Sequence, residues 1–191
     1  TDSNQYQPDI ATLKDGGFII VWRSEGQDLS SGGIYAQRFD AAGTPIGAEF
    51  RVNTTTASNQ DDPAVTALEN GGWVVTWTDQ YGAAPATYDV FLQQYDAAGR
   101  QLDGQTLVNR YTPYLQHQPA ITSMADGGFV VAYSSYVYSS DQNSDGVPDI
   151  GAAKRVGATI KTRPQLLSEL FNAAPTSVGV AGTSGKSTIT G

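Results

Sequence analysis

Cysteine is absent from the 191-residue sequence, and histidine occurs only once. The lack of cysteine excludes disulfides, zinc–thiolate sites and cysteine nucleophiles. The sequence also contains no run of 18 apolar residues, so hydropathy predicts no membrane-spanning helix. Basic residues are scarce, with 11 Lys and Arg against 19 Asp and Glu. This balance argues against a nucleic-acid partner, because binding to a phosphate backbone requires lysine and arginine.

Charge and aromatic content change abruptly near residue 150. Residues 1–150 hold six basic and eighteen acidic side chains, a net charge of −12, whereas residues 151–191 hold five basic and one acidic, a net charge of +4. Only Phe171 of the nineteen aromatic residues follows residue 138. Such a shift predicts two segments of different origin, so a natural fusion or a chimera joined near residue 150 is one hypothesis. Thr1, in place of Met, is expected of a processed or excised chain.

Three related stretches recur in the first segment. QPDIATLKDGGFIIVW (7–22) returns as DPAVTALENGGWVVTW (62–77) and as QPAITSMADGGFVVAY (118–133). YAQRFDAAG (35–43) returns as FLQQYDAAG (91–99), and the dipeptide Val-Asn returns once, each 56 residues later. Periods near 50 residues are typical of propeller blades or repeat arrays. The predicted repeat units are residues 1–56, residues 57–112 and an incomplete unit at 113–150.

Each repeat is predicted to form four antiparallel strands. In the first repeat these are PDIATL, GFIIVWR, GIYAQRFD and AEFRVN, with a tight turn at Asp15-Gly16-Gly17. The second strand is almost wholly apolar, as in strands buried on both faces. The predicted fold is mainly β, with ~55-residue repeats in an open or partial β-propeller-like arrangement, followed by a short α/β-type C-terminal tail. A β-sandwich of hairpins is the alternative. Further β repeats or the sheet edge of a partner would cover the exposed strand edges.

The repeats resemble the P-x-[IV]-x-x-L-x-D-G-G-F-V-V-x-W … Y-x-Q-R-[FY]-D-x-x-G … V-N units of large secreted bacterial proteins. The resemblance covers about residues 5–145. Many of those proteins carry hemolysin-type (RTX) calcium repeats and act as exoproteins or adhesins. The resemblance therefore implies a non-catalytic structural or adhesive module, located extracellularly or at the cell surface. It also implies a cell-surface glycan or a protein as the partner.

The acidic stretch DQNSDGVPD (141–149) has the pattern of a calcium loop. Oxygen donors alternate at its first, third and fifth positions, and Gly146 permits a sharp turn. Ca²⁺ prefers six to eight oxygen ligands, which such an alternation supplies. The loop is similar to the D-x-[DN]-x-D-G-x-x-D loops of propeller and thrombospondin-type repeats, whereas Ala152 replaces the glutamate of an EF-hand. A solvated turn is the alternative. The predicted ligands are Asp141, Asn143, Asp145, the carbonyl of Val147, and Asp149.

The C-terminal segment has a different pattern. RPQLLSELF (163–171) predicts a short helix, SVGVAG a buried strand and GTSGKST a glycine-rich phosphate loop, although Val180 departs from the strict Walker pattern. Residues 150–191 resemble the start of the amino-acid-adding Mur ligases of peptidoglycan synthesis. The resemblance implies that Mg-ATP would contact Gly182, Thr183, Ser184, Gly185, Lys186, Ser187 and Thr188. It stops short of the remaining ATPase domain, so the alternative function is an inactive ATP-binding fragment, and the location would then be cytoplasmic.

Weaker candidates lie among the repeats. They are His117 for a catalytic triad, Asp61 and Asp62 for acid–base chemistry, Tyr133, Tyr136 and Tyr138 for sugar stacking, and Asp28 and Asp79 in loops equivalent to the calcium loop. Each candidate also has a simpler interpretation. The histidine would lie in a loop, the two adjacent aspartates would cap the start of a strand, and the tyrosines would belong to the core. The two loop aspartates would lie in turns that lack the alternating pattern of calcium ligands. The leading prediction is a binding or structural module rather than an enzyme.

Overall fold

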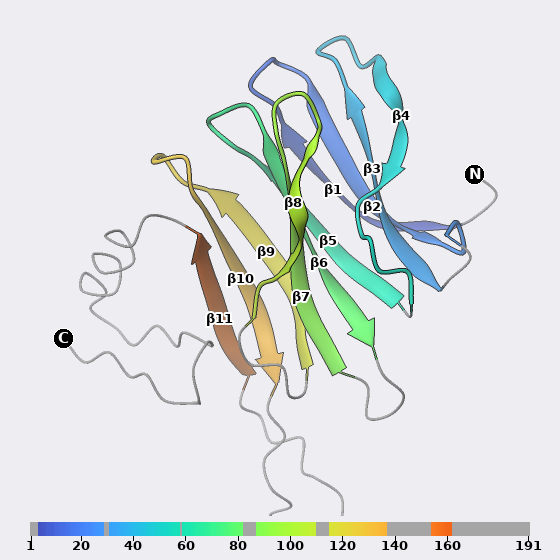
Figure 1. The fold of residues 1–191 in the computed structure, drawn as a ribbon, viewed down its shortest axis with the longest axis vertical. Helices are drawn as coiled ribbons and strands as arrows, with labels where there is room; N and C mark the ends of the chain where they lie inside the picture. Colours follow the sequence, from blue (N-terminus) through green and yellow to red (C-terminus); the bar gives the residue numbers. More distant parts are fainter. Residues whose placement is uncertain are drawn as a thin grey trace, which may run out of the picture.

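The computed structural model describes residues 4–28, 31–57, 59–81, 87–109, 115–136 and 154–161. These residues form strands and turns, with no helix among them, so the predicted all-β fold of the repeats is confirmed (Figure 1). The predicted helix at 163–171 lies outside the described residues. The strands are β1 (Gln5–Thr12), β2 (Phe18–Glu25), β3 (Gly32–Phe39), β4 (Pro45–Arg51), β5 (Asn59–Ala67), β6 (Trp73–Tyr81), β7 (Thr87–Tyr95), β8 (Gln101–Leu107), β9 (Leu115–Ser123), β10 (Phe129–Tyr136) and β11 (Lys154–Lys161).

The strands group into three units that follow the sequence repeat. Strands β1 to β4 pair antiparallel in chain order and form unit one, and β5 to β8 do the same in unit two. Strands β9, β10 and β11 form unit three. Single parallel residue pairs, Gly32 with Asn59 and Tyr88 with Leu115, connect neighbouring units. The result is one curled, mixed sheet in which the units fan out side by side (Figure 1).

Unit three continues beyond residue 150. Strand β11 pairs with β10 over its whole length, from Phe129 opposite Lys161 to Tyr136 opposite Lys154. It therefore occupies the position that β3 has beside β2 and β7 has beside β6. The change in charge and aromatic content near residue 150 thus falls between two strands of one unit. The division of the chain into domains at that point stays a prediction.

Each Asp/Asn-Gly-Gly corner joins the first and second strands of a unit. The first glycine has a φ of 85° to 87°, a region that glycine enters without steric cost (Gly16, Gly71 and Gly127). The second glycine is needed for space, because a Cβ on Gly72 would lie 2.3 Å from the carbonyl oxygen of Tyr95. The side chain of Asn70 accepts a hydrogen bond from the Gly72 amide at 2.9 Å and fixes the turn.

The apolar interior lies between the units rather than within them. The first cluster joins the buried face of unit one with the facing side of unit two, and its largest members are Ile19, Ile34, Trp73, Trp77 and Tyr95. The second cluster joins unit two to unit three through Val74, Val90, Leu92, Phe129, Val131 and Tyr133. Because Tyr133 is only 2% exposed, it belongs to this interior and not to a sugar-stacking platform. Face-to-face packing of β units is the arrangement of propeller blades.

The recurring Val-Asn dipeptide closes each complete unit. The Val52 amide donates to the carbonyl of Ile34 at 2.7 Å, and the Asn53 side-chain oxygen accepts from the Ile34 amide at 2.7 Å. Val108 and Asn109 make the same two bonds to Val90, at 2.8 and 2.7 Å. A buried valine and a buried asparagine thus fasten the end of the fourth strand to the third strand of the unit.

Candidate functional site

Both sites predicted from sequence motifs lie outside the described residues. This holds for the calcium loop, with Asp141, Asn143, Asp145, Val147 and Asp149, and for the phosphate loop, with Gly182, Thr183, Ser184, Gly185, Lys186, Ser187 and Thr188. Both therefore stay predictions. The part of the chain that is described contains no group of three or more His, Cys, Asp or Glu side chains placed to bind a metal ion. It also contains no helix long and apolar enough to cross a membrane.

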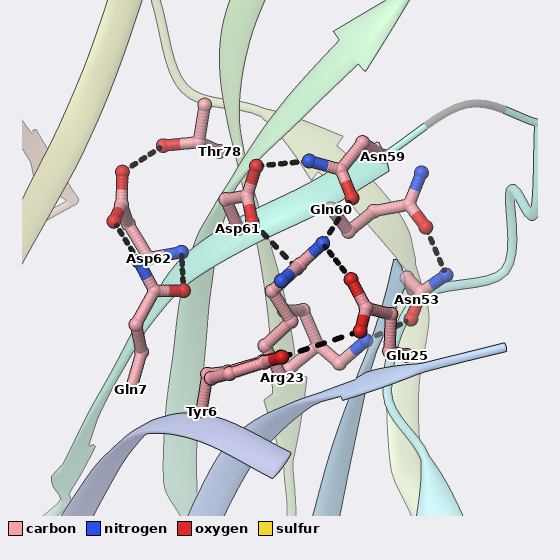
Figure 2. Close-up of polar contacts among 11 residues, drawn as sticks. Tyr6, Gln7, Arg23, Glu25, Asn53, Asn59, Gln60, Asp61, Asp62 and Thr78 are labelled. Carbon is pink, nitrogen blue, oxygen red and sulfur yellow. Dashed lines mark hydrogen bonds and ion pairs between the residues drawn. The ribbon is translucent and has the colours of Figure 1, made fainter. Parts of the chain in front are cut away.

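A connected group of polar side chains lies at the junction of units one and two (Figure 2). We call it the junction cluster. It draws side chains from β1, β2, β5 and β6, at the end of the units opposite the Asp/Asn-Gly-Gly corners. Its members are Tyr6, Gln7, Arg23, Glu25, Asn59, Asp61, Asp62 and Thr78.

A β-bulge at the proline in the first strand of each unit (β1, β5 and β9), which we call the inner strand, produces this arrangement. The residue before the proline has a positive φ in all three units, with values of 51° for Gln7, 52° for Asp62 and 54° for Gln118. The strand register slips at the same points. A bulge changes the direction of side chains and interrupts the regular hydrogen bonding between strands. Here it turns side chains and backbone amides toward the neighbouring unit.

Gln7 and Asp62 hold the two inner strands together reciprocally. The Gln7 amide Nε2 donates to Asp62 Oδ1 at 2.7 Å, and the Asp62 backbone amide donates to Gln7 Oε1 at 3.2 Å. The junction of units two and three uses the backbone amide of the equivalent residue before the proline. There the Gln118 amide donates to Thr78 Oγ1 at 3.2 Å. The positive φ at these positions therefore serves contacts between units.

Arg23 is the centre of the junction cluster. Its Nε lies 2.6 Å from Asp61 Oδ1, and its Nη2 donates to Asn59 Oδ1 at 2.9 Å. Nη2 also lies 3.6 Å from Glu25 Oε1, and the guanidinium lies 5.4 Å from the centre of the Tyr6 ring. Burial raises the pKa of Asp61 above its usual value, and the Arg23 charge opposes that rise. The Arg23 cation thus compensates the carboxylate of Asp61, which the junction partly removes from water.

These contacts decide what Asp61 and Asp62 do. Asp61 contacts Arg23 and accepts a hydrogen bond from Asn59, whereas Asp62 contacts Gln7 across the junction (Figure 2). The two carboxylates therefore have separate hydrogen-bond and ion-pair partners. The arrangement suits a clamp between units rather than acid–base chemistry.

A second polar feature is a buried carboxylate pair that sequence patterns largely missed. Asp79 on β6 lies directly opposite Asp89 on β7, and the two residues are 2% and 0% exposed. Gln60 Nε2 donates to Asp79 Oδ1 at 3.1 Å, and Asn109 Nδ2 donates to Asp89 Oδ1 at 2.6 Å. Burial raises the pKa of each carboxyl to about 6.

The location of Asp79 corrects the sequence interpretation, which placed it in a loop equivalent to the calcium loop. It is a strand residue because β6 extends to Tyr81, beyond the apolar run WVVTW that marked the strand. The sequence signal for Asp89 was only a lone acidic residue in the strand TYDVFLQQY. Asn109 carried a better signal, since it belongs to the repeated Val-Asn dipeptide.

Replacing Arg23 with methionine is expected to destabilise the protein by about 1.5 kcal/mol, because Asp61 would lose the charge that compensates its burial. The loss should be larger at pH 7 than at pH 4, since protonation removes the uncompensated charge. Urea unfolding at both pH values measures this. Arg100→Met is the matched control: Arg100 pairs with Asp96 at 2.7 Å but is 82% exposed, so its loss should be small. Equal effects of the two variants would contradict this role of Arg23.

Comparison with known proteins bears on the fold alone. No family model and no curated protein matches the sequence, so the RTX-type and Mur-ligase resemblances find no support there. The structure is similar to an α-L-arabinofuranosidase from Lactobacillus brevis, with 12% identity and a TM-score of 0.53 over 84% of this chain and 53% of that one. It is also similar to a protein of unknown function from Dyadobacter fermentans DSM 18053, with 10% identity and a TM-score of 0.55 over 83% and 50%.

An exo-1,5-α-L-arabinanase from a bovine ruminal metagenomic library is a further match, with 14% identity and a TM-score of 0.49 over 72% of this chain and 50% of that one. The chain thus spans about half the length of the structures it matches. At these identities the likeness shows a partial β-propeller-like fold and no activity.

Proposed function

We propose that this chain is a non-catalytic structural and binding module of a secreted or cell-surface bacterial protein. The observation that supports the proposal is that the polar side chains at the junction of units one and two bind one another. Arg23, Asp61, Asp62 and Gln7 contact one another across units one and two instead of facing a common open site. The RTX-type repeat pattern supports the extracellular location and a cell-surface glycan or protein as the partner.

Two of the similar structures are arabinan- or arabinoside-degrading enzymes by name. We do not extend that activity to this chain. Glycoside hydrolysis generally requires a pair of carboxylates on either side of a sugar. Asp61 is bound to Arg23, Asp62 is bound to Gln7, and Asp79 and Asp89 are buried. These four aspartates therefore present no carboxylate pair to a substrate.

Calcium is the cofactor of the proposed module, bound by residues 141–149. We expect CaCl₂ to raise the melting temperature, with a Kd on the order of 10⁻⁴ M or weaker, as in other extracellular modules. A ligand that binds only the folded state stabilises it by about 2.7 kcal/mol at a hundredfold excess over Kd. Calorimetry and thermal melts with CaCl₂ measure both quantities, with MgCl₂ for comparison.

Asp145→Asn should abolish the calcium effect, because it removes a charged ligand from the centre of the loop. Asp126→Asn is the matched control, since it removes the same charge in the same unit. Asparagine at that position retains the side-chain oxygen that accepts from the Gly128 amide at 3.0 Å. The calcium site would be contradicted if calorimetry detected no heat of calcium binding to the unmodified chain. It would also be contradicted if both variants lost the calcium-induced rise in melting temperature equally.

The alternative function is an ATP-binding fragment of the Mur-ligase type, and the sequence GTSGKST is the observation that favours it. In the same melts, Mg-ATP should leave the melting temperature unchanged if the module proposal is correct. A rise with Mg-ATP that Lys186→Ala removes would favour the alternative, since the loop lysine contacts the phosphates.

A further inference from the structure

The corner of unit two contains an asparagine that is followed directly by a glycine. Asn70 is the only asparagine of the sequence at which this happens. Asparagine is among the thermolabile residues of proteins, because the nitrogen of its side-chain amide can be displaced. The attacking group is the backbone nitrogen of the next residue, and a glycine there has no side chain to obstruct the approach. Asn70 is also exposed to water.

Units one and three carry aspartate at the same position. The repeat aligns Asp15 and Asp126 with Asn70, and two glycines follow each of them. In all three corners the side-chain Oδ1 accepts a hydrogen bond from the amide of the second glycine, at 3.0 Å, 3.0 Å and 2.9 Å respectively. The side-chain NH₂ of Asn70 takes no part in this contact. Exchange of that NH₂ for an oxygen therefore leaves intact the hydrogen bond that fixes the corner.

The folded corner restrains both groups that would react. The Gly71 amide donates to the carbonyl of Leu68 at 2.9 Å, and the Gly72 amide holds the side-chain oxygen of Asn70. The Leu68 amide donates in turn to the carbonyl of Gly72 at 2.8 Å and closes the corner. The Gly71 nitrogen can reach the Asn70 side chain only when its bond to Leu68 is broken. Exposed turns open locally more readily than buried strands, so this opening precedes the reaction.

A cation from unit one lies beside this position. Lys14 Nζ donates to the carbonyl oxygen of Glu69 at 2.7 Å, and that carbonyl belongs to the peptide group that joins Glu69 to Asn70. A carboxylate at position 70 would be attracted by this ammonium group and repelled by the exposed Glu69 side chain. The two effects oppose each other, so the surroundings of the corner accept an additional negative charge.

We propose that Asn70 is a site of spontaneous deamidation in this chain and that the corner of unit two accepts the aspartate product. The Gly71 nitrogen loses its proton to solvent and attacks the side-chain carbon Cγ of Asn70. The new N–Cγ bond forms, the Cγ–Nδ2 bond breaks, and the side-chain nitrogen leaves as ammonia. Water then opens the resulting succinimide ring. Opening at Cγ gives aspartate, whereas opening at the main-chain carbonyl carbon gives isoaspartate.

The two products differ in how they fit the corner. Isoaspartate routes the chain through its side chain and so adds an atom to the backbone between Leu68 and Gly72. The lengthened turn cannot keep both of the hydrogen bonds that join these two residues to the corner. Aspartate instead reproduces the corners of units one and three. This inference goes beyond the proposed function and does not depend on it.

Peptide mass spectrometry of the full chain, after incubation in mildly alkaline buffer, tests the reaction. Asn70 should exchange its NH₂ for OH faster than Asn4, an exposed asparagine that Gln5 follows. Gly72→Ala should accelerate the exchange at Asn70 at least about tenfold, because it destabilises the corner and increases its opening. Unfolding the unmodified chain in urea should also accelerate it. The inference is wrong if Asn70 reacts no faster than Asn4, or if neither Gly72→Ala nor urea increases its rate.

A pair of variants tests whether the corner accepts the product. Asn70→Asp should leave the melting temperature unchanged, because the oxygen that accepts from the Gly72 amide is retained. Asn70→Ala is the matched control and should lower the melting temperature, since it removes that acceptor. Equal losses in the two variants would overturn the acceptance of aspartate. None of these measurements involves calcium, so their outcome is independent of the calcium test.

Discussion

Replacing Gly72 with alanine is expected to destabilise the protein by on the order of 3 kcal/mol. The added Cβ would lie 2.3 Å from the Tyr95 carbonyl oxygen and 3.1 Å from the Asn70 side-chain oxygen. The carbonyl belongs to the backbone of β7, which pairs with β6, so it cannot move without disturbing the ladder. Tyr95 itself stacks on Trp73 in the apolar interior between units one and two. The substitution should therefore disrupt both the corner and the junction.

Urea unfolding monitored by tryptophan fluorescence measures this effect, and Gly104→Ala is its control. Gly104 lies in β8, and a Cβ added there would have no other group within 4 Å, so alanine should change stability by less than about 1 kcal/mol. Gly17→Ala should behave like Gly72→Ala, because its Cβ would lie 2.3 Å from the Phe39 carbonyl oxygen. If the Gly72 and Gly104 variants were equally stable, the close approach of Gly72 to the Tyr95 carbonyl oxygen would be contradicted.

Local chemistry explains why much of the fold was predictable. The Asp/Asn-Gly-Gly corners require a positive φ and a close backbone approach, which only glycine provides, so the motif marks the first hairpin of each unit. The Val-Asn dipeptide marks the end of the fourth strand because its valine amide and its asparagine side chain bond to the backbone of Ile34 in unit one and of Val90 in unit two. Repetition of these short-range signals identified the units, their strand order and the propeller-like class.

The junction cluster was not predictable in the same way. A residue before proline favours extended backbone, so the local rule gives no indication of the positive φ at Gln7, Asp62 and Gln118. Contacts between units override that preference, and they join residues about 55 positions apart. The single parallel pairs between units and the burial of Asp79 opposite Asp89 depend equally on how separate repeats pack. The repeat pattern identified the units but not the groups that hold them together.

The buried carboxylate pair should make the protein less stable at neutral pH than in mild acid. Burial raises the pKa of Asp79 and Asp89 from 3.8 to about 6, so the folded state binds more protons than the unfolded state between these values. The contribution of the pair to the free energy of unfolding should therefore fall as pH rises from about 4 to about 6 and stay constant above. Urea unfolding across this range measures the slope.

Asp79→Asn is expected to flatten this slope and to stabilise the protein by about 2 kcal/mol at pH 8, because a neutral amide avoids the cost of burying a charge. Asparagine retains the oxygen that accepts from Gln60. The exposed Asp103 has a positive φ that asparagine also tolerates, so Asp103→Asn controls for net charge.

Asp89 also raises the pKa of Asp79 through its charge, so Asp89→Asn should lower that pKa. The stabilisation of the double variant at pH 8 should then be less than the sum of the two single effects, and strict additivity would show that the carboxylates do not interact.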